Sequence, residues 1–160
     1  MEKGLEVISI DKNIKEEELH SQEKFKVDIE LFVPENKRIG DILLINVLSC
    51  VDANKRIEIL KNLKKIKSPS SRIFVINTSD SIGDEDFESK YISVKRKSEK
   101  IVNLTNKKID GTEIVFDDYL IGKDEFLRYC EESGLRISDE KELYFPDENK
   151  APIFNFYTLI

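Results

Sequence analysis

Polar side chains stand at the ends of several apolar runs in this 160-residue sequence. Asp11 follows the run 5–10, Asn46 lies late in the run 41–48, and Asp52 comes shortly after that run. Carboxylate and amide groups at such places can hydrogen-bond the hydroxyl or amino groups of a ligand. They can equally serve the fold, because an aspartate caps a following helix and a buried amide finds protein partners. Both alternatives stay open for all three residues.

Other reactive side chains point to no standard catalytic or metal site. One histidine, His20, and two distant cysteines, Cys50 and Cys130, cannot form a zinc site, and no Ser-His-Asp set can be argued from spacing. We expect His20 at the surface and both cysteines as buried free thiols in a reducing compartment. The basic run 95–97, near Tyr91, could contact an anionic acceptor, although a solvated hairpin face is favoured.

Composition indicates a charged globular protein. Hydrophobic residues make up 39% and charged residues 36%, and the formal net charge is -6. This balance disfavours a protein built mainly to bind nucleic acid or anionic lipid. No apolar run approaches the roughly 20 residues that span a bilayer, and residues 1–10 lack a signal-peptide core. We therefore expect a cytoplasmic protein of one domain.

The central organising element lies between residues 40 and 80. Residues 41–48 form an apolar, branched run of the kind typical of a strand buried on both faces. Residues 53–67 carry one apolar stripe, which predicts a helix with a wet outer face: Ile57, Leu60, Leu63 and Ile66. Pro69 ends the helix, and residues 72–77 form a second buried-strand run. This spacing predicts a parallel strand–helix–strand unit.

The preceding segment predicts three shorter elements. Residues 5–10 read as a strand, residues 14–20 as one or two acidic helical turns, and residues 25–33 as a strand that ends before Pro34.

Residues 81–121 predict a small antiparallel insertion. Short β-prone pieces at 91–94, 101–104 and 112–116 are separated by polar turns, and Asp110-Gly111 suits a two-residue hairpin turn. We expect an insertion in a single domain, because the segment is too short for a core of its own.

The last part of the chain predicts a helix and two strands. Residues 123–133 form a helix with Phe126, Leu127 and Cys130 facing inward, and Gly134 suits a left-handed C-terminal cap. Residues 135–145 fit a bent or bulged strand, and 153–160 fit an aromatic, β-branched one. Since a short loop joins them, they should pair antiparallel.

The order of these elements resembles the class I S-adenosylmethionine-dependent methyltransferase fold over nearly the whole chain. Residues 7–11 are similar to that family's second strand, 27–30 to its third, and 40–48 to its fourth. Residues 57–76 resemble the next helix and the fifth strand, and 124–135 resemble the late helix. The resemblance implies an α/β fold with a Rossmann-like, mostly parallel sheet, a C-terminal antiparallel strand pair and a small antiparallel insertion.

The same resemblance implies S-adenosylmethionine as cofactor. In the family an acid in the position of Asp11 binds the ribose hydroxyls, and one in the position of Asp28 lies near the adenine amino group. Asn46, Val47 and Leu48 would line the cofactor beside the methyl group. We name no catalytic residue, because this chemistry depends on aligning a nucleophile with the methyl group.

One part of the family pattern is not found in this sequence. The family begins with a strand, a glycine-rich loop and a helix, and the glycines let backbone N–H groups approach the cofactor. Here no two of the six glycines lie within four residues of each other. The sequence thus resembles an N-terminally truncated domain, and without the first strand we expect two sheet fragments with exposed edges and a slot between them.

Three hypotheses follow. The chain is the C-terminal part of a split or truncated methyltransferase that a protein partner completes, a catalytically inactive binding or scaffold subunit, or a subunit that closes the gap by self-association. The methyl acceptor stays unknown, although the acidic balance disfavours nucleic acid.

Overall fold

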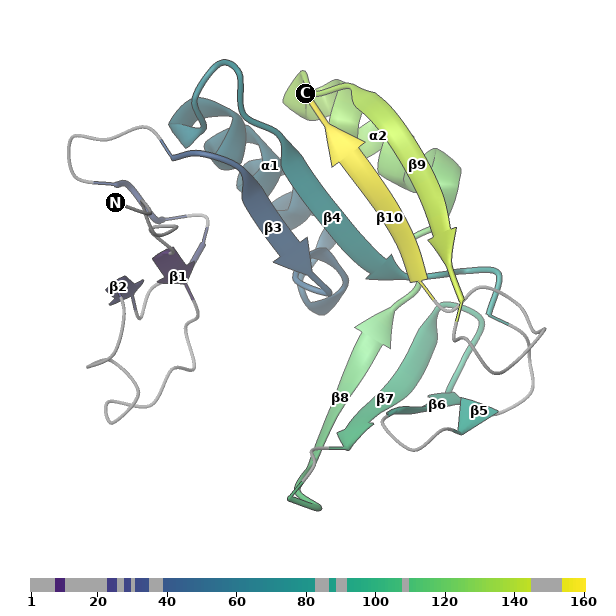
Figure 1. Cartoon of the computed structure of the whole chain (residues 1–160). Coiled ribbons are helices and arrows are strands. Elements are labelled where there is room, and N and C mark those ends of the chain that lie inside the picture. Colours follow the sequence, from purple (N-terminus) through teal and green to yellow (C-terminus); the bar gives the residue numbers. More distant parts are fainter. Residues whose placement is uncertain are drawn as a thin grey trace.

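The computed structural model describes residues 8–10, 23–25, 28–29, 31–34, 39–82, 87–88, 92–107, 110–144 and 154–160. These parts form a sheet backed by helices, with a second sheet at one end (Figure 1). The elements are β1 (Ile8–Ile10), β2 (Glu23–Phe25), β3 (Ile42–Ile45), the 3-10 helix η2 (Leu48–Cys50), α1 (Ala53–Ile66), β4 (Ile73–Thr78), β5 (Phe87–Glu88), β6 (Ile92–Arg96), β7 (Ile101–Lys107), β8 (Glu113–Tyr119), α2 (Lys123–Ser133), β9 (Ile137–Leu143) and β10 (Phe154–Leu159).

The main sheet has the strand order β3-β4-β10-β9. β3 and β4 pair in parallel, as predicted for the unit around α1, and β10 is antiparallel to both β4 and β9. The predicted C-terminal strand pair is therefore confirmed. β3 ends at Ile45, earlier than expected, because Asn46 adopts a left-handed φ of 51° and a 3-10 turn follows.

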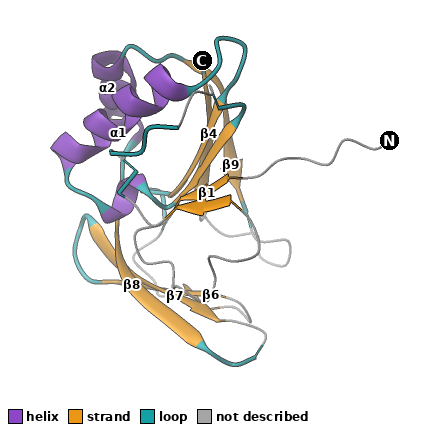
Figure 2. Cartoon of the chain, turned by 90° about the vertical axis from the view of Figure 1, so that its left-hand side faces the viewer, coloured by secondary structure: helices purple, strands orange, loops and turns teal. Residues whose placement is uncertain are grey.

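Both main helices lie on one face of this sheet (Figure 2). The bounds of α2 are those predicted, and Gly134 ends it with a φ of 71°. Its inward face differs from the prediction: Tyr129 is buried beside Phe126 and Cys130, while Leu127 is 36% exposed. Leu127 was wrongly placed because a short apolar triplet does not fix which side of a helix meets the core.

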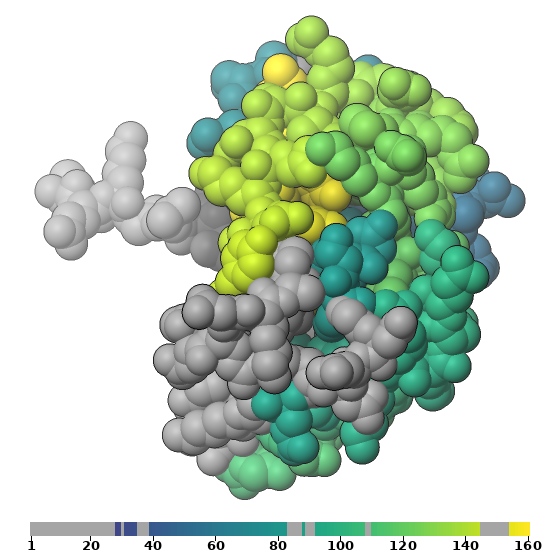
Figure 3. Space-filling model, turned by 90° about the vertical axis from the view of Figure 1, so that its right-hand side faces the viewer, coloured from purple at the N-terminus to yellow at the C-terminus, as the bar shows by residue number. Residues whose placement is uncertain are grey.

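The main core lies between the helices and the sheet. It joins buried residues of α1, α2, β4 and β10, among them Leu60, Phe126 and Tyr157. The rings of Phe126 and Tyr157 are 4.3 Å apart at their centroids. In Figure 3 the yellow atoms of β10 show only in small patches, in agreement with its burial. No helix of the described residues is long and apolar enough to cross a membrane.

No described helix lies over the opposite face of the main sheet in Figure 1, and we call it the open face. Leu43 and Ile45 of β3 are 57% and 58% exposed on this side. The Phe74 and Phe156 rings stack beside them, 5.9 Å apart. Within the described residues β3 has a strand neighbour only at β4. Parallel strands are normally covered on both faces, so the exposure of apolar side chains on this face is unusual.

The insertion forms a separate antiparallel sheet of order β5-β6-β7-β8, as predicted. It lies at the carboxyl ends of β3 and β4 (Figure 1). The hairpin turn has Gly111 in the left-handed region with a φ of 85°. Contrary to our expectation, this sheet buries a hydrophobic cluster of its own: Ile82, Ile92, Val94, Val102, Leu104 and Leu120. Side chains of the preceding and following connections complete that cluster, which the strand lengths alone do not reveal.

The segment before β3 matches the predictions in part. β1 and β2 pair in parallel in a small sheet apart from β3. The predicted strand 25–33 is wrong over its second half, because the Leu31 amide donates a hydrogen bond to the Asp28 carbonyl at 2.9 Å and forms a turn. That turn lets Phe32 enter the main core. The predicted helical turns at 14–20 lie outside the described residues.

Candidate functional site

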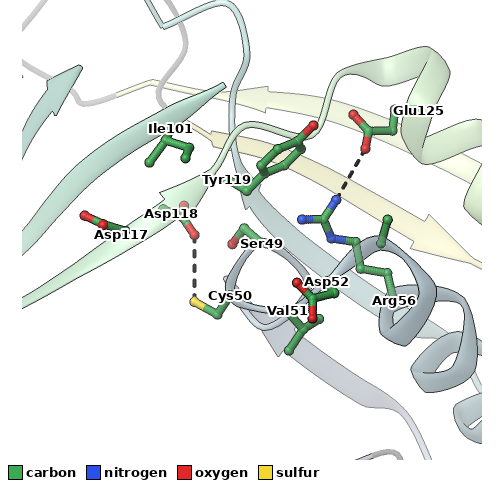
Figure 4. Close-up of a pocket in the computed structure, with 11 residues that line it drawn as sticks. Ser49, Cys50, Val51, Asp52, Arg56, Ile101, Asp117, Asp118, Tyr119 and Glu125 are labelled. Carbon is green, nitrogen blue, oxygen red and sulfur yellow. Dashed lines mark hydrogen bonds and ion pairs between the residues drawn. The ribbon is translucent and has the colours of Figure 1, made fainter. Parts of the chain in front are cut away.

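A pocket opens where the insertion meets the main body, beside the loop that follows β3 (Figure 4). Its volume is about 470 Å³. In α/β sheets, ligands bind beyond the carboxyl ends of parallel strands, and this pocket occupies such a place. Its walls come from η2, the start of α1, β7, β8 and α2: Ser49, Cys50, Val51, Asp52, Ala53, Arg56, Ile101, Asp117, Asp118, Tyr119 and Glu125.

Arg56 holds three of these elements together. It is only 4% exposed, although it is charged. Its Nε donates to the Leu48 carbonyl oxygen at 2.8 Å, and its Nη1 donates to the Tyr129 hydroxyl at 3.0 Å. The same Nη1 pairs with Glu125 Oε1 at 3.3 Å. The guanidinium carbon lies 4.4 Å from the centroid of the Tyr119 ring. The positive charge is thus matched within the protein.

Asp118 is the most deeply buried acid of the pocket, with 0% of its surface exposed. Thr78 Oγ1 donates a hydrogen bond to Asp118 Oδ2, and Cys50 Sγ lies 3.9 Å from Asp118 Oδ1 as a donor. Burial raises the pKa of Asp118, and the Ser49, Thr78 and Cys50 side chains and the Arg56 charge oppose that increase. The fold therefore holds the buried Asp118 carboxyl group in a fixed orientation in the pocket wall.

The neighbouring acids differ in their surroundings. Asp117 is exposed and accepts hydrogen bonds from Lys97 Nζ at 2.7 and 2.8 Å and from Asn103 Nδ2 at 3.2 Å. The Lys97 bond is the main reason why the pKa of Asp117 is lowered. Asp52 occupies the N-cap position of α1, as the structural interpretation predicted, but its side chain makes no capping hydrogen bond. Among the described residues, no group of three His, Cys, Asp or Glu side chains could hold a metal ion.

Three predicted cofactor residues lie together at the end of β3, next to the pocket wall. The Asn46 amide donates to the Ile76 carbonyl at 2.8 Å, and its own carbonyl accepts from Ser49 Oγ at 3.0 Å. Asn46 Oδ1 is buried and has no hydrogen-bond partner in the described structure. Val47 is half-buried. Leu48 is fully buried in the main core, so only its backbone can reach a ligand.

Asp28 is not among the residues that line the pocket. Asp28 is half-buried in the turn before β3, and Asp11 and His20 lie outside the described residues. In the basic run 95–97, Lys97 binds Asp117, and Arg96 donates to the Ile82 carbonyl at 2.6 Å.

The two cysteines have different surroundings. Neither forms a disulfide, as expected, but only Cys130 is buried, and this burial raises its pKa to about 12. Cys50 is exposed, because η2 turns it out of the core towards the pocket.

Sequence reasoning named Asp52 but missed the other charged residues of the pocket. Arg56 continues the apolar stripe of α1 towards Leu60 and Leu63, and a charged residue on an inward stripe was the available signal. Asp117 and Asp118 interrupt a β-prone run. Their opposite faces could be assigned only once the pairing of β7 with β8 was known.

No protein-family model and no curated protein matches this sequence. Solved structures do match the fold. An S-adenosylmethionine-dependent methyltransferase from Clostridium acetobutylicum has a TM-score of 0.64 at 10% identity, over 95% of this chain and 73% of that one. The CcbJ methyltransferase from Streptomyces caelestis has a TM-score of 0.60 at 8% identity, over 85% and 62%. The glycopeptide N-methyltransferase MtfA, complexed with S-adenosylmethionine, has a TM-score of 0.57 at 11% identity, over 84% and 58%.

At these identities the likeness establishes the fold, which is that of class I S-adenosylmethionine-dependent methyltransferases. The chain spans less than two thirds of the length of the CcbJ and MtfA structures.

Proposed function

We propose that this chain takes part in S-adenosylmethionine-dependent methyl transfer, with its acceptor in the pocket between η2 and β8. The observation that supports this most directly is the position of the pocket, beyond the carboxyl ends of two parallel strands in this fold. The insertion supplies one wall of this pocket through β7 and β8, so it would lie against an acceptor bound there. The chemistry that the cofactor supplies is a methyl group bound to positively charged sulfur.

The cofactor side of the proposed site is the loop after β3. Asn46 offers a buried carbonyl oxygen without a partner in the described residues, and a cofactor amino group would supply the missing donor. The backbone of Val47 and Leu48 would continue this wall. Asp11 on the ribose hydroxyls and Asp28 near the adenine remain proposals from the family pattern.

We further propose that cofactor binding requires a second polypeptide that supplies a strand and a glycine-rich loop beside β3. The exposed Leu43 and Ile45 side chains support this, as does the edge of β3 that no described strand pairs with. A strand added in parallel along β3 would satisfy its outward N–H and C=O groups, and an attached helix would cover the apolar face.

Calorimetric titration tests the function. We expect little heat when S-adenosylmethionine is added to this chain alone, and micromolar binding once a polypeptide with a strand, glycine-rich loop and helix is present. A reading frame adjacent to the gene is the first source to try. No binding in either sample would refute the hypothesis that the chain belongs to an enzyme. The remaining hypothesis would then be a non-catalytic scaffold subunit, whose open sheet face contacts other subunits. Micromolar binding by the chain alone would refute both the scaffold and the need for a partner.

One substitution tests the proposed interface. Ile45→Lys places a charge on the open face, where its partner would pack, so the complex and its cofactor binding should be lost. Ile114→Lys is the matched control, because Ile114 is 45% exposed on the insertion. Sedimentation velocity measures both complexes and also detects self-association. Equal effects of the two substitutions would contradict the assigned face.

A further inference from the structure

The acids that line the pocket are only partly balanced by protein cations. Glu125 pairs with Arg56 at 3.3 Å and with Lys100 at 3.8 Å. Asp117 pairs with Lys97 at 2.7 Å. Asp118, by contrast, receives hydrogen bonds but forms no salt bridge with any described residue. Asp52, the fourth acid of the lining, also forms no salt bridge with a described residue, but it is exposed to solvent. Asp118 is therefore the one buried acid of the cavity whose charge no described salt bridge matches.

Asp118 is also the acid that the fold orients most firmly. Donors from two other elements hold its two oxygens: Thr78 at the end of β4 and Cys50 in η2. A buried carboxylate without a cation is unfavourable, and it either takes up a proton or receives a cationic partner. A cavity of about 470 Å³ beside it has room for a small molecule that brings such a cation.

We propose that the pocket binds a cationic amine, that its ammonium group lies against Asp118, and that Asp118 removes the proton that this amine must lose before it can accept a methyl group. The proposal rests on the proposed function, because it names the class of acceptor for the same site.

The proton step is balanced within the pair. One N–H bond of the ammonium group breaks and one O–H bond forms on Asp118, so a positive and a negative group become a neutral amine and a neutral acid. The amine keeps the electron pair that a nucleophile needs. A carboxyl group whose pKa is raised by burial is a better proton acceptor than an ordinary aspartate.

The groups around Asp118 agree with this assignment. From α1, Arg56 faces it, but Glu125 matches the Arg56 charge. From η2, the Ser49 hydroxyl and the Cys50 thiol face it, and from β4 the Thr78 hydroxyl does. All three groups are neutral. Thr78 and Cys50 donate to the carboxylate, while the Ser49 hydroxyl donates its proton to the Asn46 carbonyl, so the carboxylate is oriented without being neutralised.

Three probes of equal size test the charge preference: benzylamine, benzyl alcohol and benzoate. Each is titrated into the full chain and followed by amide chemical shifts in a nitrogen–proton correlation spectrum. We expect benzylamine to shift amides of residues 49–56 and 117–119, with at least roughly tenfold weaker effects from the other two. Benzoate or benzyl alcohol binding as tightly as benzylamine would overturn the proposal, as would shifts confined to other parts of the chain.

Asp118→Asn and Asp117→Asn form a matched pair, since the two residues are adjacent on β8. Asp118→Asn should weaken benzylamine binding by about tenfold or more, whereas Asp117→Asn should change it little, because Lys97 already occupies Asp117. Equal losses in the two variants, or a loss only in Asp117→Asn, would overturn the proposal.

The pH dependence of the unmodified protein gives an answer even if Asp118→Asn fails to fold. Benzylamine binding should weaken as pH falls through the raised pKa of Asp118, and thus above roughly pH 4, the ordinary range of aspartate. A midpoint below that range would point to Asp117, whose pKa is lowered, and would overturn the proposal.

These measurements need no cofactor, so they are read separately from the calorimetry. Absence of S-adenosylmethionine binding with a partner present would refute the methyl transfer and the proton step with it. Cofactor binding without a preference for benzylamine would refute only the proposal that the acceptor is an amine.

Discussion

The main body and the insertion bury hydrophobic cores in different ways. The body packs two helices on a sheet whose other face stays open, while the insertion folds one antiparallel sheet over a small cluster. In the body, buried polar contacts such as those of Arg56 connect distant segments. In the insertion, the charged pairs Lys97–Asp117 and Lys107–Glu88 lie at its surface.

This difference indicates that the two regions position different parts of the pocket. The body sets where the strand ends and the start of α1 lie, and the insertion brings the acids of β8 to that place. The pocket lies where the two meet, and two buried contacts join them there: Arg56 against the Tyr119 ring, and Thr78 with Asp118.

The largest effect should come from removing the link between the two regions. Arg56→Met removes the buried guanidinium from the Tyr129 hydroxyl and from Glu125, which keeps only the longer Lys100 contact at 3.8 Å. Loss of one partner of a buried ion pair costs about 3–5 kcal/mol, and we expect the lower end of that range because Glu125 is partly exposed. Urea denaturation measures the free energy of unfolding. Lys61→Met, at an exposed position of the same helix, is the control. A loss below about 1 kcal/mol would show that Arg56 does not join the regions energetically.

The next test asks whether the insertion opens on its own. Leu104→Ala creates a cavity in the insertion cluster and should cost about 3 kcal/mol, and Leu60→Ala does the same in the main core. In hydrogen exchange, Leu104→Ala should speed exchange in β6–β8 and leave α1 protected. Equal acceleration in α1 would mean that the two regions form one cooperative unit.

A smaller effect should appear at the end of α2, within the body. Gly134→Ala forces a side chain into a left-handed conformation and should cost about 1–2 kcal/mol. A Cβ atom there would also come within 2.5 Å of Lys64 Nζ, although that flexible side chain can move. Gly40→Ala is the control, since no atom lies within 4 Å of the added Cβ. Thermal unfolding compares the two, and similar midpoints would contradict the prediction.

The smallest effect should come from the surface of the insertion. Lys97→Met removes the main cause of the lowered pKa of Asp117. Because the folded-state pKa is lowered, this pair contributes stability above the unfolded pKa of about 4 and loses it as pH falls through the folded value. The difference between variant and parent in urea midpoint should thus be slight at pH 7, smaller in high salt, and absent near pH 2. A difference that persists in high salt would contradict a surface role.

Periodic segments of the sequence predicted the body well. The stripe from Leu60 to Ile66 fixes which side of α1 meets the core, since its apolar side chains share one face. The run ending at Asn77 is apolar on both faces of β4, which is typical of a strand inside a sheet. Gly134 was placed correctly because few other residues can end a helix there without strain. The order of these elements was enough to predict the fold.

The pocket was harder to predict because its residues meet through tertiary contacts. Asp118 matters only because β8 returns beside Thr78, some forty residues earlier in the chain. The strand predicted around Asp28 was wrong because a local turn overrode a short alternating pattern. Tyr129 is buried in place of Leu127 because its hydroxyl accepts a hydrogen bond from Arg56, and the sequence of α2 alone does not reveal this contact.

The bond between Thr78 and Asp118 also bears on how the chain folds. It ties the point where the chain leaves β4 to the point where it returns from β8. β10 must then insert between β4 and β9, a pairing between residues far apart in sequence, which slows folding. If the insertion forms early, it shortens the flexible chain between β4 and β10. The entropy lost when β10 pairs with β4 is then smaller. We therefore expect the hairpin β7–β8 to be structured in the rate-limiting step, before the central sheet is complete.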